Sequence, residues 1–184
     1  EVVHELSPDV VVVVGSEEQA GRLEEAVGGF GARFVVDEIG LGPSCPLLGL
    51  ISGLRAVREG KALAVACDMP LVSANVLSFL AEVMSYMNAS VPRWPNGYVE
   101  PLQAAYRTRA AVRAGEELLG AGGPLDLRSF LRSLGRVRYI STKVLEEIDP
   151  GLSTFLNINT PGDIVRAEML LRARGACGAQ RGSR

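Results

Sequence analysis

One apolar run that ends at an acid constrains this chain more than any other stretch. Ala62 to Ala66 are all small or branched and apolar, which is typical of a short strand buried on both faces of a parallel sheet. Asp68 follows after one residue, and Pro70 prevents the strand from continuing. Ligands of open α/β sheets bind at the carboxyl ends of the strands. Asp68 is therefore the leading candidate for a functional residue.

The rest of the chain alternates between strand-like and helix-like segments over its first half. The patterns predict strands over 10–14, 33–36, 89–91, 99–106 and 137–140, and helices over 17–27, 47–54, 73–87, 107–119, 125–134 and 162–174. This order predicts βαβ units and an α/β fold with a mainly parallel sheet. We expect one domain over residues 1–174, followed by a small, polar and disordered tail over 175–184.

Composition excludes several classes of function. The net charge of −2 and the absence of a basic cluster before the last residues argue against nucleic-acid binding. No apolar run approaches the roughly 20 residues of a membrane span. His4 is the sole histidine, which argues against a Ser-His-Asp hydrolase or a histidine-built metal site. Three cysteines without close spacing fit a reducing compartment, and we expect a cytoplasmic protein.

Asp68 suits a hard cation such as Mg²⁺, which takes one or two carboxylates together with water and phosphate oxygens. The alternative is that its side chain only caps the following turn. A second acid, Asp37, ends the strand over 33–36 and opens a glycine-rich loop that leads to Pro46. Backbone amides at such a helix start suit a phosphate or the edge of a base, although an ordinary connection explains the loop equally well.

Two asparagines, Asn157 and Asn159, stand at alternate positions of a short extended segment. Alternate positions face the same side, so both side chains can bind one polar ligand. Asparagines near a helix start also commonly satisfy loop backbone. The residues alone leave both readings open.

Several of these segments occur in the order seen in a known enzyme family. The matching segments are Asp37, Pro46 to Leu54, Cys67 to Pro70, Glu100 to Tyr106 and Phe155 to Asp163. Together they resemble the molybdenum cofactor guanylyltransferases, nucleotidyltransferases of the MobA-like type. The resemblance implies a three-layer α/β/α Rossmann-like fold. It also implies transfer of GMP from GTP to molybdopterin with release of pyrophosphate, and apo-molybdoenzymes as further partners.

The resemblance assigns roles to individual residues of this chain. It implies that Asp68 is the catalytic, Mg²⁺-binding aspartate. The nucleotide would contact Asp37, Pro46, Leu47, Gly49 and Asp68. Asn157 and Asn159 would face the pterin.

The sequence departs from the family at two places. Cys45 stands where the family usually has glycine, which is tolerated only if the φ angle there is negative. The family's first strand and its glycine-rich triphosphate loop, with an arginine and a lysine, do not appear before Glu1. We therefore expect these 184 residues by themselves to bind GTP weakly and to turn over poorly.

Two other functions compete with guanylyl transfer. One is a cytidylyl- or sugar-nucleotidyltransferase, which tighter binding of CTP than of GTP would reveal. The other is a catalytically inactive module that binds the cofactor, which pterin binding without nucleotide binding would reveal.

Overall fold

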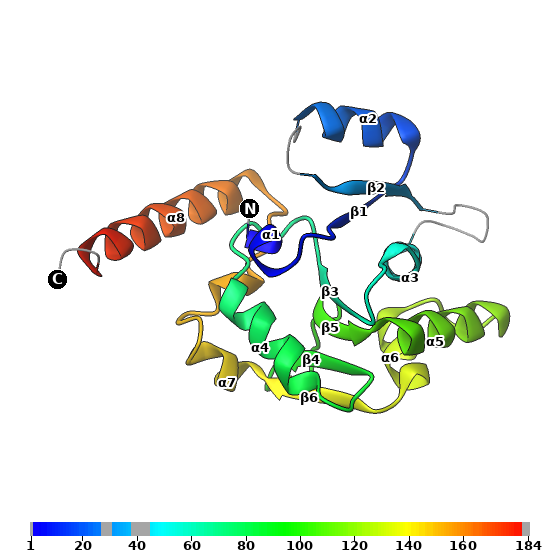
Figure 1. Ribbon diagram of the computed structural model, residues 1–184. Coiled ribbons are helices and arrows are strands. Elements are labelled where there is room, and N and C mark those ends of the chain that lie inside the picture. The colour runs from blue at the N-terminus through cyan, green and yellow to red at the C-terminus, as the bar shows by residue number, and fades with distance from the viewer. Residues whose placement is uncertain (1, 27–30, 38–44, 182–184) are drawn as a thin grey trace.

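The computed structural model describes residues 2–26, 31–37 and 45–181, with side chains through 173. Its elements are α1 (Val2–Leu6), β1 (Val11–Val14), α2 (Glu17–Ala26), β2 (Arg33–Val36), α3 (Pro46–Ala56), β3 (Lys61–Val65), α4 (Ala74–Met84), β4 (Ala89–Arg93), β5 (Gln103–Arg107), α5 (Thr108–Gly120), α6 (Leu127–Leu134), β6 (Val137–Ser141), α7 (Thr142–Glu146), a 3₁₀ turn (Ser153–Phe155) and α8 (Pro161–Arg181). Figure 1 shows their arrangement.

The strands form two sheets. β1 and β2 pair in parallel, and a four-stranded sheet has the order β3-β5-β4-β6. β5 is antiparallel to both β3 and β4, whereas β6 is parallel to β4, so β3, β4 and β6 all run in one direction. The α/β class and the common direction of most strands are confirmed. Among the described residues no backbone ladder joins β1 to β3.

Helices cover both faces of the four-stranded sheet, as the three-layer architecture requires (Figure 1). α3, α5 and α6 pack over one face, where Tyr106 and Phe130 lie fully buried. α4 and α7 cover the other face, where Leu145 packs near Ala105. Neighbouring residues of β5 thus contribute to opposite cores, because side chains alternate across a strand.

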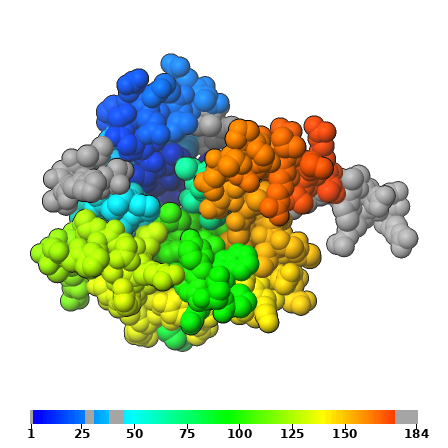
Figure 2. Space-filling model, turned by 180° about the vertical axis from the view of Figure 1, so that it is seen from behind, coloured from blue at the N-terminus to red at the C-terminus, as the bar shows by residue number. Residues whose placement is uncertain are grey.

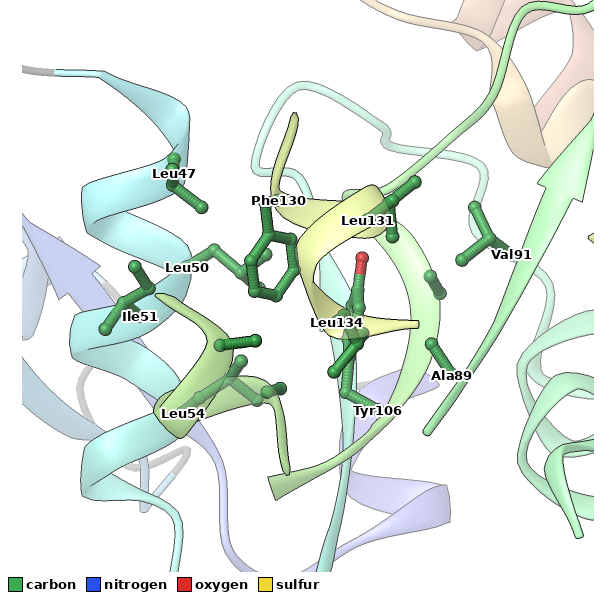
Figure 3. Packing of buried hydrophobic residues seen from close by; sticks show 13 residues of the cluster. Leu47, Leu50, Ile51, Leu54, Ala89, Val91, Tyr106, Phe130, Leu131 and Leu134 are labelled. Carbon is green, nitrogen blue, oxygen red and sulfur yellow. The ribbon is translucent and has the colours of Figure 1, made fainter. Parts of the chain in front are cut away.

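The core beneath α3 is built from leucines at helical spacing. Leu47, Leu50, Ile51 and Leu54 belong to one buried cluster, in which Leu47 and Leu50 point toward Phe130 of α6 (Figure 3). Gly115 of α5 lets the two helices approach closely, since a Cβ there would lie only 2.6 Å from Cγ1 of Ile51. This packing fixes the helix that begins at Pro46, and with it one wall of the candidate site.

Most helix starts agree with the local sequence. The Ser73 hydroxyl accepts a hydrogen bond from the backbone N–H of Val76, and Asp126 accepts from two backbone N–H groups at the start of α6. Cys45 precedes α3 with φ −137° and ψ 153°, an extended conformation open to any residue. The substitution of cysteine for glycine therefore costs no backbone strain.

Two elements differ from the sequence predictions. α7 follows β6 directly and was not expected, because its five residues show no amphipathic period. The backbone of α8 is helical through Arg181, although composition predicts a disordered tail over 175–184. The end of the domain at 174 stays a prediction. In Figure 2, α8 (orange) and the N-terminal residues (blue) lie at one end of the molecule.

No helix in the described part of the chain is both long enough and apolar enough to cross a membrane.

Candidate active site

Asp68 follows β3 at the edge where β3, β4 and β6 all end. The backbone N–H of Ile158 donates a 2.8 Å hydrogen bond to the carbonyl oxygen of Asp68. This bond places the segment of Asn157 and Asn159 against the end of β3, although the two segments lie far apart in sequence. The structure thus brings together two of the three features that the sequence singled out.

Several side-chain oxygens at this edge are buried without a hydrogen-bond partner among the described residues. They are Asp68 Oδ1, Asn157 Oδ1 and Gln103 Oε1. Orphaned buried oxygens are costly and require an explanation. Because two of these oxygens belong to site residues predicted from the sequence, the simplest explanation is that a ligand or an ion binds at this edge.

Asn157 and Asn159 differ in their surroundings. Asn157 is half-buried and Asn159 is exposed, and no regular strand covers them. The backbone N–H of Asn159 donates to Oδ2 of Asp163 at 3.2 Å. The same carboxylate accepts from the backbone and the hydroxyl of Thr160, both at 2.8 Å, and caps α8. These hydrogen bonds lower the pKa of Asp163, and the bond from the Thr160 hydroxyl has the largest effect.

Asp37 forms a second group with α3. It follows β2 and is 8% exposed, and Ser52 Oγ donates a 2.7 Å hydrogen bond to its Oδ1. A Cβ on Gly49 would lie 3.8 Å from Asp37 Oδ2, so this glycine leaves room beside the carboxylate. Residues 38–44 of the predicted glycine-rich loop lie outside the described residues.

The other predicted nucleotide contacts have unequal access to a ligand. Pro46 is exposed at the start of α3. Leu47 is fully buried against the core, and Figure 3 shows its side chain directed toward Phe130. Any contact between Leu47 and a nucleotide would therefore use its backbone. Among the described residues no hydrogen bond joins the group around Asp37 to the group around Asp68.

Sequence reasoning missed two residues that border this edge. The indole N–H of Trp94 donates a 2.7 Å hydrogen bond to Oε1 of Glu100. Burial raises the pKa of Glu100, and the carboxylate of Asp68 raises it further. Glu100 stood inside a segment matched to the family, but an isolated acid before Pro101 carries no local signal of its place beside Asp68.

A shallow hollow of about 280 Å³ opens next to Trp94. It is lined by Arg93, Trp94, Pro95, Tyr139 and Ser141. The Arg93 guanidinium lies over the ring of Tyr139, 5.7 Å from its centroid. β4 ends at Arg93 and β6 ends at Ser141, so the hollow lies at the same edge of the sheet as Asp68.

A mixed sheet between two layers of helices, with acids at its carboxyl edge, is an α/β architecture that binds ligands at that edge. The family match assigns this architecture to the nucleotidyltransferases. Residues 1–137 match the family described as "MobA-like NTP transferase domain". The chain belongs to this family.

Relatives and solved structures agree with this membership. A protein of Pelotomaculum thermopropionicum named "Probable molybdenum cofactor guanylyltransferase" is 32% identical over 169 residues, which are 92% of this chain and 76% of the relative. The crystal structure of molybdopterin-guanine dinucleotide biosynthesis protein A from Archaeoglobus fulgidus has a TM-score of 0.71 at 30% identity, covering 89% of this chain and 78% of that one. The resemblance predicted from the sequence is thereby confirmed.

A cytidylyltransferase shares the fold. The 2-C-methyl-D-erythritol 4-phosphate cytidylyltransferase of Thermus thermophilus has a TM-score of 0.62 at 21% identity, covering 89% of this chain and 82% of that one. At this identity the likeness concerns the fold alone.

Proposed function

We propose that this chain transfers GMP from GTP to a molybdopterin-type acceptor. The observation that carries the proposal is the buried, unpartnered Oδ1 of Asp68 beside the Asn157 segment, in a chain that is 32% identical to a named guanylyltransferase. In this reaction a phosphate oxygen of the acceptor bonds to the α-phosphorus of GTP. The bond from that phosphorus to the bridging oxygen breaks, and pyrophosphate leaves.

The residues at the edge of the sheet fit Mg²⁺. Asp68 offers a buried carboxylate oxygen without another partner among the described residues. Oxygen donors of this kind are those that Mg²⁺ prefers, and it keeps further positions for water and phosphate oxygens. A bound Mg²⁺ would offset negative charge on the triphosphate and on the leaving pyrophosphate.

The protein's own residues position the two substrates. Asp37 would accept hydrogen bonds from the ribose or the base of the nucleotide, and the hydrogen bond from Ser52 would hold its carboxylate in position. The start of α3 at the exposed Pro46 would receive the nucleotide, and Gly49 lies close to that carboxylate on the same helix. On the other side, Asn157, Asn159 and the hollow with Arg93 and Tyr139 suit a planar acceptor that carries negative charge. Such transfer depends on positioning and charge neutralisation rather than on a covalent intermediate.

Guanine is favoured over cytosine because the named relative is a guanylyltransferase, whereas the cytidylyltransferase likeness concerns only the fold. We further propose that the protein works in the cytoplasm, since three cysteines without close spacing fit a reducing compartment, and that apo-molybdoenzymes receive the product.

The test is a transfer assay with α-³²P-labelled GTP, Mg²⁺ and molybdopterin, in which labelled dinucleotide and pyrophosphate are both measured. The proposal expects both products in equal amounts and no transfer from labelled CTP. Transfer from CTP at a greater rate would favour the cytidylyl alternative. Pterin binding without binding of either nucleotide would favour the inactive binding module.

A further inference from the structure

The pairing of β3 with β5 brings a second acid to the edge where Asp68 lies. Val65 is the last residue of β3 and stands opposite Gln103, the first residue of β5. Asp68 comes three residues after Val65, and Glu100 comes three residues before Gln103. Both segments turn as they leave the ladder, since the backbone N–H of Gln103 donates to the carbonyl oxygen of Glu100 and that of Met69 to the carbonyl oxygen of Ala66. Asp68 and Glu100 therefore leave neighbouring strands at the same end of the ladder.

Trp94 holds Glu100 in this place. Its indole N–H donates to Oε1 of Glu100 at 2.7 Å, and the backbone N–H of Glu100 donates to the carbonyl oxygen of Pro92 at 3.1 Å. The Trp94 ring also packs edge to face on Phe155, with the centroids 5.6 Å apart. Phe155 lies two residues before Asn157, so the indole connects Glu100 to the asparagine segment.

Two carboxylates that leave neighbouring strands at one partly buried edge repel each other unless a cation or a proton lies between them. Glu100 is half-buried, so water screens this repulsion only in part. Asp68 Oδ1 has no hydrogen-bond donor among the described residues that would relieve the repulsion. All the groups gathered here offer oxygen, which is the donor that a hard divalent cation takes.

We propose that Glu100 is the second carboxylate of the divalent-cation site at Asp68, and that Trp94 fixes its orientation. This inference rests on the proposed function only in that Asp68 is taken as the cation-binding aspartate. With Oε1 bound by the indole, Oε2 is the oxygen that Glu100 offers to the cation or to one of its water ligands. Trp94 and Glu100 are thus positioning residues for the cation.

The chain contains one tryptophan, so tryptophan fluorescence reports on the indole that donates to Glu100. The experiment titrates the full chain with MnCl₂, since Mn²⁺ prefers the same oxygen ligands as Mg²⁺ and quenches fluorescence at short range. Free Mn²⁺ is measured in parallel by electron paramagnetic resonance. The unaltered chain is expected to show saturable quenching that follows Mn²⁺ binding.

Glu100→Gln keeps the shape of the side chain and removes its charge. It is expected to weaken Mn²⁺ binding about 10- to 100-fold. Glu100→Asp keeps the charge but shortens the side chain by one methylene group. Its Mn²⁺ affinity should lie between that of the unaltered chain and that of Glu100→Gln. It replaces the glutamine variant if that variant does not fold. Trp94→Phe, followed by paramagnetic resonance only, should weaken binding less than Glu100→Gln. Glu82→Gln, an exposed acid on α4, is the matched control and should change nothing.

The outcomes separate this inference from the proposed function. If Asp68→Asn loses Mn²⁺ while Glu100→Gln binds it as tightly as the unaltered chain, Glu100 is not part of the site and the role of Asp68 stands. If both variants bind Mn²⁺ normally, or the unaltered chain binds none, the cation site itself is wrong. Loss of Mn²⁺ binding in both variants, with normal circular dichroism, supports the inference even in a chain that transfers no GMP.

Discussion

The hydroxyl of Ser52 donates a 2.7 Å hydrogen bond to Oδ1 of Asp37, and both side chains are buried. Ser52 lies on the same helix whose leucines fill the core, so the packing of α3 sets the position of a carboxylate at the end of β2. The buried Ser52 therefore holds the carboxylate of Asp37, which is the candidate nucleotide contact.

The first prediction concerns this bond. Ser52→Ala should lower the free energy of unfolding by about 1–3 kcal/mol, because the buried carboxylate loses its donor. It should also raise KM for GTP more than it lowers kcat, since Asp37 acts in binding. Thermal unfolding and nucleotide titration measure the two effects. Ser133→Ala, on the exposed face of α6, is the control, and an equal effect there would contradict the role of Ser52.

The second prediction concerns Asp68. Asp68→Asn keeps the size of the side chain and leaves the backbone bond to Ile158 in place. GMP transfer should fall on the order of 100-fold or more, because charge stabilisation by a metal ion contributes several kcal/mol to the transition state. The transfer assay measures this, with circular dichroism as the check on folding. Activity close to that of the unaltered chain would show that Asp68 only caps a turn.

The third prediction separates the two substrates. Asn157→Ala should raise KM for the pterin about tenfold or more, since one or two hydrogen bonds of ordinary strength are lost. GTP binding should change less, because Asp37 and α3 form the nucleotide side. Steady-state kinetics with each substrate varied in turn tests this. An increase in KM for GTP alone would place Asn157 on the nucleotide side instead.

The fourth prediction concerns the contact between α3 and α5. Gly115→Ala should lower the free energy of unfolding by about 1–3 kcal/mol, because the new methyl group would overlap Ile51. Alanine's better helix propensity, about 1 kcal/mol, does not offset this overlap. Gly21→Ala on α2 is the matched control, since nothing lies within 4 Å of its Cβ, and it should stabilise the protein slightly. Urea unfolding of both variants decides the sign.

The fifth prediction is a dependence on pH. Arg33 donates to Asp9 Oδ1 from Nε at 3.0 Å and from Nη2 at 2.7 Å, and these hydrogen bonds lower the pKa of Asp9. A carboxyl group whose pKa is lower in the folded protein stabilises it above the unfolded pKa of about 4, and this contribution is lost as the pH falls through the folded pKa. Asp9→Asn should therefore lower Tm at pH 7 and lose that difference in acid.

Glu24→Gln on α2 serves as the control for this experiment. If the difference in Tm between Asp9→Asn and the unaltered chain stays constant down to about pH 2, Asp9 acts through packing rather than through its charge.

Much of the fold follows from local pattern. The valines of β1, the apolar run of β3 and the leucines of α3 each predicted the correct type of element. The expected burial of the apolar run on both faces of a parallel sheet was wrong for the described residues, since Ala62 to Val65 are half-buried and β3 pairs only with β5, in antiparallel. Boundaries moved by a few residues, as at β5, where hydrogen bonding begins only at Gln103. α7 escaped prediction because five residues are too short to show a period.

The candidate site was predictable only in part. The pattern of an acid after an apolar strand predicted Asp68 and Asp37. The segments that occur in the same order as in the family predicted Asn157 and Asn159. Nothing local indicated Ser52 or Glu100, since their importance depends on which residues they face. The sequence also contained no sign that Asn157 and Asn159 have different surroundings. Asn157 has a buried oxygen without a partner among the described residues, whereas Asn159 is exposed.

The sequence by itself determined that a strand over the apolar run stops shortly before Asp68, because an apolar run, an acid and a proline permit little else. The tertiary structure decided what surrounds that acid. The pairing of β3 with β5 brings Glu100 to the same end of the ladder, and a backbone hydrogen bond from Ile158 brings the segment of Asn157 beside it. Such neighbours come from distant parts of the chain, so their meeting depends on strand pairing and helix packing rather than on any local preference.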